Sequence, residues 1–128
     1  VNSVIVGSIT SNGSATAFNT SSDYRLKENV TYSWDATTRL KQLKPARFNF
    51  ISDSTDTLVD GFLAHEVSSV VPEAITGDKD GTYTEQDESD NLGKEGDAKY
   101  QAIDQSKLVP LLVKTIQELE ARITALES

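Results

Sequence analysis

Residues 106–128 read SKLVPLLVKTIQELEARITALES and carry the most regular hydrophobic pattern of the chain. Large apolar residues recur there at alternating intervals of three and four positions: Val109, Leu112, Ile116, Leu119, Ile123 and Leu126. This spacing predicts a helix with a heptad seam, with β-branched residues at the a positions and leucine at the d positions. Pro110 is compatible only with the first helical turn, so the helix is expected to start between Ser106 and Val109.

This seam has two interpretations. It predicts either an amphipathic helix that packs on the core of its own chain or a coiled coil between copies of the chain, and we favour self-association. Arg122 and Glu127 occupy g and e positions that pair between neighbouring helices. Fewer than three heptads are short for an isolated coiled coil, so we expect support from a globular part. The a and d residues favour a parallel dimer, and the heptads alone do not predict a trimer.

The first 20 residues, VNSVIVGSITSNGSATAFNT, are mostly small, β-branched or polar. They predict two short strands, and Asn12-Gly13 would supply the positive φ angles of a tight hairpin turn. Such strands have too few large side chains for a core of their own. We therefore expect the end of a fibrous β-structure that pairs with other chains. Since the chain opens with Val1 rather than methionine, we also expect it to be a piece of a longer protein.

The central part predicts short helices and strands in alternation, which gives an α+β fold class. Ser33 or Asp35 is expected to cap the first of these helices, and Pro45 and Pro72 are expected to stop the two helices. The expected elements are a helix over 33–44, a strand over 46–51, a turn at Asp60-Gly61, a helix over 64–71 and a strand over 100–104.

Charge is concentrated in one stretch of the 128-residue chain, whose net charge is −8. Residues 78–97 hold eight acidic side chains and two lysines, a net charge of −6, and their glycines, aspartates and serine predict a long exposed loop. Acidic surface repels phosphate groups, so nucleic acid is not an expected partner. A membrane is not expected either, because no apolar run approaches the roughly 18 residues of a membrane span.

Metal and cofactor sites are not expected. The absence of cysteine excludes disulfides, zinc–thiolate sites and thiol catalysis. The stretch DESDNLGKEGD, residues 87–97, lacks glycine at the sixth position of the calcium-loop pattern, which favours a solvated loop. His65 is a candidate for a second base, although a lone histidine among apolar neighbours is more often a structural residue.

The stretch SSDYRLKENV, residues 21–30, sets a serine and a lysine five positions apart. A serine hydroxyl attacks a carbonyl only when a base takes its proton. A lysine amine acts as that base only when neutral, whereas the ordinary lysine pKa of about 10.4 leaves it charged at pH 7. Lowering such a pKa to 7 or 8 costs about 4 kcal/mol and requires burial or a nearby cation such as Arg25.

Neither a helix nor a strand brings Ser22 to Lys27 at this spacing. Either a turn at residues 23–25 joins the two side chains, or they meet across chains. From residue types and spacing alone, the plainer interpretation is favoured. In that interpretation Ser21 or Ser22 caps a turn and Lys27 is solvated.

Four segments of the chain form a recognisable set: NTSSDYRLKENV (19–30), LKQLKPARFNF (40–50), DGFLAHEVSSVVPEAITG (60–77) and YQAIDQSKLVPLLVKTIQELEARI (100–123). Together they resemble the intramolecular chaperone domain of phage tailspikes and tail fibres, the S74 peptidase type shared with endosialidase tailspikes and the myelin regulatory factor. The resemblance covers roughly residues 15–126 in the same order.

The resemblance implies a homotrimer whose C-terminal domain brings three chains into register with the preceding fibre domain and then cuts itself off. It implies a catalytic pair of Ser22 and Lys27 and a scissile bond between Ser21 and Ser22, without a cofactor. Asp23, Arg25 and Asn29 match the same motif as possible positioning groups.

The implied organisation is a stalk end over residues 1–21, a globular chaperone and autopeptidase part over 22–105, and a coiled-coil helix over 106–128. The expected location is a virion tail-fibre precursor, used in host attachment and assembled in the bacterial host cytoplasm, with the chaperone fragment released after cleavage. We further expect Lys27 to be desolvated only in the assembled trimer. The alternative is a non-cleaving trimerisation domain or a receptor-binding tip, which would expose an aromatic-rich surface.

Overall fold

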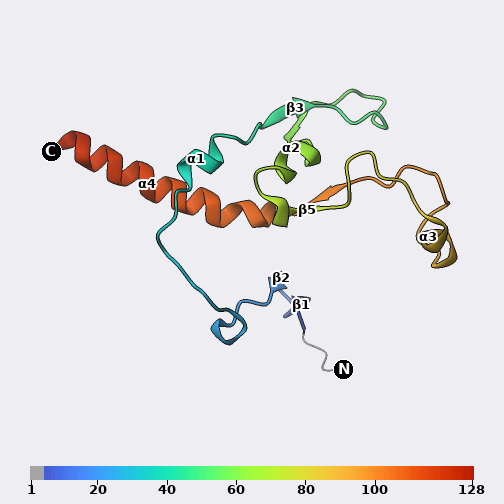
Figure 1. Cartoon of the computed structure of the whole chain (residues 1–128), viewed down its shortest axis with the longest axis horizontal. Helices are drawn as coiled ribbons and strands as arrows, with labels where there is room; N and C mark the ends of the chain where they lie inside the picture. The colour runs from blue at the N-terminus through green and yellow to red at the C-terminus, as the bar shows by residue number, and fades with distance from the viewer. Residues whose placement is uncertain (1–4) are drawn as a thin grey trace. The chain divides into compact units, whose positions relative to one another are not determined.

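The computed structural model describes residues 5–128 (Figure 1), so the first four residues of the predicted fibrous segment lie outside the described part. The chain divides into two compact units, Val1–Trp34 and Asp35–Ser128. The boundaries expected from the resemblance, after residues 21 and 105, concern cleavage and assembly, and they stay predictions.

The first unit contains the predicted hairpin. Strands β1 (Gly7–Ser11) and β2 (Thr16–Thr20) pair antiparallel. In the turn, the Asn12 side-chain oxygen accepts hydrogen bonds from the backbone N–H groups of Ser14 and Ala15, at 3.1 and 2.9 Å. Gly13 has a positive φ of 90° but Asn12 does not, so the prediction of two positive φ angles is wrong for Asn12. Every residue from 5 to 34 is exposed, so this part of the unit buries no core.

The second unit mixes short helices with pairs of antiparallel strands, which confirms the α+β class. Strand β3 pairs with β4, and β5 pairs with β6. The elements in chain order are α1 (Thr37–Leu40), β3 (Ala46–Phe48), β4 (Val59–Gly61), α2 (Ala64–Ser68), η2 (Pro72–Ala74), β5 (Ile75–Thr76), α3 (Glu85–Ser89), β6 (Ala102–Ile103), η3 (Gln105–Leu108) and α4 (Val109–Glu127).

The core lies where α2 and η2 meet the beginning of α4, and α1 packs against α4 (Figure 1). Its buried apolar residues are Ala36, Val67, Val71, Ala74, Leu108 and Leu111. The core is small because most large apolar side chains of the described residues are exposed in the single chain.

Two local predictions are corrected by strand pairing. Asp60-Gly61 was expected to be a turn, but both residues belong to β4, where Asp60 lies opposite Arg47 of β3. The two side chains form an exposed ion pair at 2.7 Å. The predicted strand over 46–51 ends earlier, at Phe48, although the rings of Phe48 and Phe50 do meet on one side at a centroid distance of 5.4 Å.

The acidic segment is an ordered arm rather than an irregular loop. This arm, residues 77–101, rises from β5 and β6, continues through a bridge between Thr82 and Ala98, and carries α3. Thr84 caps α3 through a reciprocal capping box with Asp87. Lys99 lies over the Tyr83 ring, 5.5 Å from its centroid. The arm is exposed as predicted, but local hydrogen bonds and a stacked side chain give it a defined conformation.

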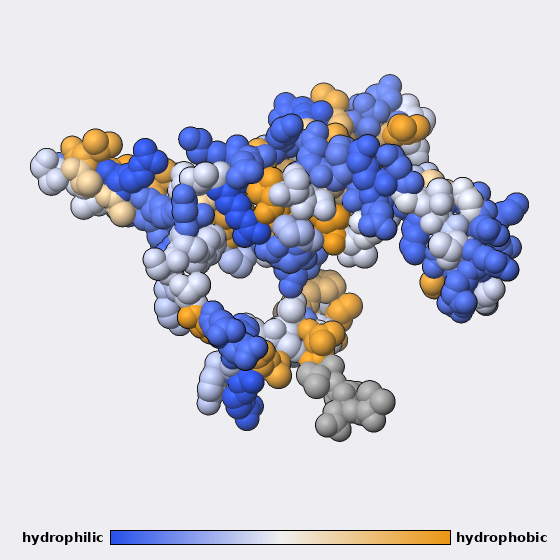
Figure 2. Space-filling view, in the orientation of Figure 1, coloured by the Kyte–Doolittle hydropathy of each residue, from blue (hydrophilic) through white to orange (hydrophobic). Residues whose placement is uncertain are grey.

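Helix α4 uses two different faces. Leu108, just before the helix, and Leu111 and Thr115 within it are buried against the chain's own core, and Glu118 is half-buried on the same face. The predicted heptad seam lies elsewhere, and its six residues are between 41 and 86% exposed. Figure 2 shows apolar residues at the surface near the C-terminal end of α4. The helix start agrees with the prediction, with Pro110 in the first turn.

Candidate functional site

A single turn of 3-10 helix, η1 (Tyr24–Leu26), follows the hairpin in the first unit. Its cap is Asp23, whose carboxylate accepts a hydrogen bond from the Arg25 backbone N–H at 2.8 Å. The backbone N–H of Lys27 donates to the Tyr24 carbonyl at 3.1 Å and closes the turn. The expected cap, Ser21 or Ser22, is therefore replaced by Asp23, which leaves both serine hydroxyls free of that role.

The turn brings Ser22 and Lys27 together within one chain. The Lys27 Nζ donates a hydrogen bond to the Ser22 Oγ at 2.7 Å. The sequence left open whether the two side chains meet through a turn or across chains, and the structure shows the turn. Their catalytic role stays a prediction. A general base has to accept the hydroxyl proton, and this contact supplies the distance that such a transfer requires.

The contact between Ser22 and Lys27 lies in solvent, since both residues are exposed. Removal of water from an amine favours its neutral form. The geometry of the pair is thus present in the single chain, while the dry surroundings that a neutral amine requires are not.

Arg25 does not supply the cation that the sequence suggested as an alternative to burial. Its Nε donates to an Asp23 carboxylate oxygen at 3.0 Å, in an exposed pair. The side-chain hydrogen bond with Arg25, its backbone N–H and the charge of Lys27 hold the pKa of Asp23 below its ordinary value. The same pairing raises the pKa of Arg25. The charge of Arg25 is thus paired with Asp23, and burial is the other route that the sequence analysis named.

Asn29 changes the direction of the backbone after the turn. It has a positive φ of 54°, in the left-handed region that asparagine tolerates better than most residues. Of the three positioning candidates, Asp23 and Arg25 stabilise the turn and Asn29 redirects the chain after it.

Large apolar side chains in the turn and in the segment that follows it, up to residue 34, are exposed. The turn patch consists of Tyr24, Leu26, Val30, Tyr32 and Trp34, which are 81, 58, 63, 84 and 37% exposed. Three of these five exposed side chains are aromatic, a feature that the receptor-binding alternative predicts. An exposed group of this kind is typical of an interaction surface, because water is a poor environment for it.

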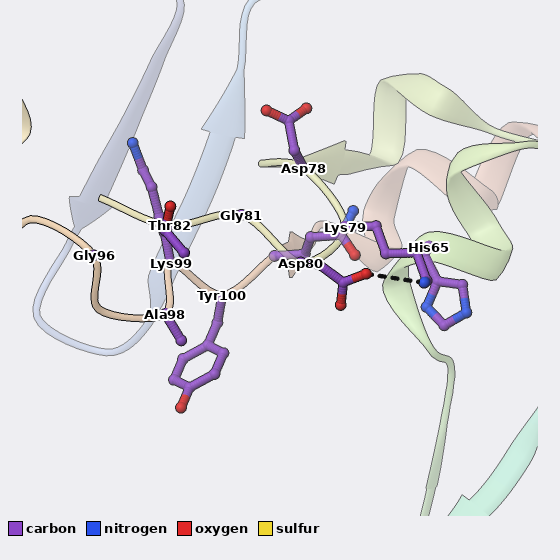
Figure 3. Close-up of a pocket in the computed structure, with 11 residues that line it drawn as sticks. His65, Asp78, Lys79, Asp80, Gly81, Thr82, Gly96, Ala98, Lys99 and Tyr100 are labelled. Carbon is purple, nitrogen blue, oxygen red and sulfur yellow. Dashed lines mark hydrogen bonds and ion pairs between the residues drawn. The ribbon is translucent and has the colours of Figure 1, made fainter. Parts of the chain in front are cut away.

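A cavity of about 490 Å³ lies in the second unit, between α2 and the base of the arm (Figure 3). His65 lies at one end of it and Lys99 and Tyr100 at the other. The two lysines that line the cavity are already paired, Lys79 with Asp80 at 3.1 Å and Lys99 with Asp87 at 3.4 Å. The cavity therefore lacks an unmatched charge from these lysines, and His65 as a second base stays a prediction.

Glu118 of α4 contacts the start of α1, and the sequence does not predict this contact. Its carboxylate accepts hydrogen bonds from the backbone N–H groups of Ala36 and Thr37, at 2.9 and 3.2 Å. The partners are 82 and 81 positions away in the chain, so no local pattern predicts the contact. The only hint in the sequence is that Ala36, directly before α1, has no side chain that caps a helix.

Within residues 5–128, no group of three or more histidine, cysteine, aspartate or glutamate residues is arranged to hold a metal ion. Over the same residues, no helix is both long and apolar enough to cross a bilayer.

Comparison with known proteins finds one family model that matches part of the chain. The sequence model of the peptidase S74 family, described as the chaperone of endosialidase, matches residues 22–76. A search of curated proteins found no match. The resemblance inferred from the sequence is thereby confirmed over residues 22–76. The matched segment begins at Ser22 and ends with β5, so it includes the turn, α1 and α2 but neither the arm nor α4.

Proposed function

From the chaperone-of-endosialidase domain that residues 22–76 carry, we propose that the chain is an intramolecular chaperone that assembles a phage tail fibre or tailspike as a homotrimer. Once assembled, it cuts itself between Ser21 and Ser22. The observation that carries the cleavage step is the contact of 2.7 Å between the Lys27 Nζ and the Ser22 Oγ, in a segment where the family match also begins. The setting is a virion tail-fibre precursor in the bacterial host cytoplasm.

The assembly step is supported by the surfaces that the single chain leaves exposed. The heptad seam of α4 is not used by the chain's own core, because Leu108, Leu111 and Thr115 contact that core from another face. The hairpin likewise lies among residues 5–34, none of which is buried. The heptad seam suits contact with the same seam of other copies. The hairpin suits strand pairing with the preceding fibre domain of the assembled copies.

The cleavage step follows from the position of the nucleophile directly after the scissile bond. The Ser22 Oγ attacks the carbonyl carbon of Ser21, and Lys27 takes the hydroxyl proton. The C–N bond then breaks as Lys27 returns that proton to the Ser22 nitrogen, which leaves an ester between Ser21 and the Ser22 Oγ. Water hydrolyses the ester and yields a Ser21 carboxylate and a chain that begins with the free amine and hydroxyl of Ser22. Each chain reacts once.

Assembly controls the reaction through solvent rather than through distance. The hydroxyl and the amine already meet in the single chain, but in water. A neighbouring copy that covers the turn patch would desolvate Lys27 and favour its neutral, basic form. Cleavage would then report that the chains are correctly assembled.

The test is the intact mass of the freshly expressed chain beside Ser22→Ala, Lys27→Ala and the control Ser21→Ala. We expect fragments separated between residues 21 and 22 for the wild type and for Ser21→Ala, which keeps nucleophile and base. Both Ser22→Ala and Lys27→Ala are expected to remain whole. A wild-type chain that stays whole as a trimer would contradict autoproteolysis.

That outcome would favour the second candidate, a non-cleaving trimerisation domain or a receptor-binding tip. The exposed aromatic residues of the turn patch favour this candidate, since such side chains are common in binding surfaces. The two candidates differ in whether the same patch is covered by a copy of the chain or presented to a receptor.

A further inference from the structure

The first turn of α1 is held by a carboxylate from α4. Helix α1 has only four residues, and its N-cap residue, Ala36, makes no side-chain capping bond. The Glu118 carboxylate accepts hydrogen bonds from the N–H groups of Ala36, at 2.9 Å, and Thr37, at 3.2 Å. Asp35 satisfies the next free donor, the N–H of Thr38, at 3.2 Å. A helix this short is unstable alone, and negative charge at its N-terminus stabilises it.

Glu118 also lies at the point where α4 leaves the core. The face that contains Leu111, Thr115 and Glu118 is buried or half-buried, whereas residues 119–128 are all exposed. A helix end without packing frays, so the order of α4 around Glu118 depends on what covers the following turns. The neighbouring residue Leu119 belongs to the heptad seam. Self-association along that seam therefore holds the helix at the position of the carboxylate.

The residues that Glu118 holds adjoin the segment with the proposed catalytic pair. Asp35 is the first residue of the second unit, and Lys27 precedes it by eight positions, which span at most about 28 Å.

We propose that Glu118 is a positioning residue that transmits self-association along the α4 seam to the segment carrying Ser22 and Lys27. This inference rests on the proposed function. It assigns Glu118 a role in the timing of cleavage although its carboxylate belongs to α4, outside the segment that matches the family.

The first measurement is hydrogen–deuterium exchange in the full chain with Ser22→Ala, which keeps the chain whole. Ile116→Asp disrupts the seam, and Glu118→Ala removes the carboxylate. We expect each to accelerate exchange at the N–H groups of Ala36 and Thr37 at least tenfold, with Glu118→Ala leaving the oligomer intact. Exchange at Val70 and Val71, in the core, serves as the internal reference and is expected to change little.

The double variant distinguishes coupling from a merely structural contact. If Glu118 is the link, Ile116→Asp has no further effect on Ala36 and Thr37 once Glu118→Ala is present. Independent, additive effects of the two substitutions would overturn the proposal, as would unchanged exchange in Ile116→Asp.

The second measurement is the cleavage rate with Ser22 intact. We expect Glu118→Ala to slow cleavage at least tenfold without changing the oligomeric mass. Gln117→Ala, the neighbouring exposed position of the same helix, is expected to cleave at the wild-type rate. Cleavage of Glu118→Ala at the wild-type rate would refute the proposed link. If the wild type itself stays whole, the proposed autoproteolysis fails, and the exchange measurements still decide whether Glu118 couples the seam to α1.

Discussion

At the scale of single residues, the turn after Ser22 is capped by Asp23, whereas the sequence predicted a serine cap. Asp23 caps the turn and pairs with Arg25, and this frees the Ser22 hydroxyl to contact Lys27. The need for a turn was predictable, because no regular element joins residues five positions apart at this spacing. The identity of the cap was not, since Ser, Asp and Asn are all good caps.

Thr115 offers a test of packing at this scale. Its side chain is buried, and its hydroxyl has no hydrogen-bond partner among the described residues. Replacing an unpartnered buried hydroxyl by a methyl group of similar shape removes a desolvation cost of about 1 kcal/mol. We therefore expect Thr115→Val to raise the free energy of unfolding by about 1 kcal/mol in thermal or urea unfolding. Thr124→Val, at an exposed position of α4, is the matched control. Destabilisation by Thr115→Val alone would contradict the assignment of an unpartnered hydroxyl.

The hydrogen bonds of Asp53 are expected to make the conformation of the loop between β3 and β4 depend on pH in the acid range. Hydrogen bonds from the side chain and backbone of Thr55, and from the backbone of Thr57, lower the pKa of Asp53 from 3.8 to about 2. Because the pKa is lowered in the folded state, the ionised Asp53 carboxylate stabilises the fold above pH 3.8. This stabilisation is lost as the pH falls through about 2. The amide resonances of Thr55 and Thr57 should thus stay constant from pH 7 to about pH 4 and shift near pH 2. In Asp53→Ala these resonances should differ from the wild type already at pH 7.

At the scale of elements, α4 has two faces in different surroundings. The face with Leu108, Leu111 and Thr115 belongs to the core, and the heptad seam is exposed. The sequence predicted the helix and the seam from their spacing. It did not predict the second face, because Thr115 and Glu118 look like ordinary polar positions until α1 is placed beside them.

Substitutions on the two faces are expected to have opposite consequences. Ile116→Asp lies on the exposed seam, so it should abolish self-association and leave the thermal stability of the dissociated chain nearly unchanged. Leu111→Ala creates a cavity in the core and should cost about 2–5 kcal/mol of unfolding free energy. Light scattering coupled to gel filtration, together with thermal unfolding, separates the two effects. Unfolding of the Ile116→Asp chain would show instead that the seam belongs to the chain's own core.

At the scale of the whole molecule, the sequence predicted what local signals determine and missed what distant partners determine. The hairpin and the start of α4 follow from nearby residues such as Gly13 and Pro110. Strand β4 did not, because Asp60 forms a strand only once Arg47 lies opposite. The contact between Glu118 and α1 joins residues at least 81 positions apart, beyond any periodic pattern.

The boundary between the compact units lies at Trp34–Asp35, whereas the predicted cut lies between Ser21 and Ser22. The released fragment would therefore keep residues 22–34 as an exposed N-terminal segment that includes Tyr24 and Leu26. Exposed, irregular chain ends are preferred sites of proteolysis. If the proposed cut takes place, the released fragment would therefore be degraded from its new N-terminus, and its lifetime would be short.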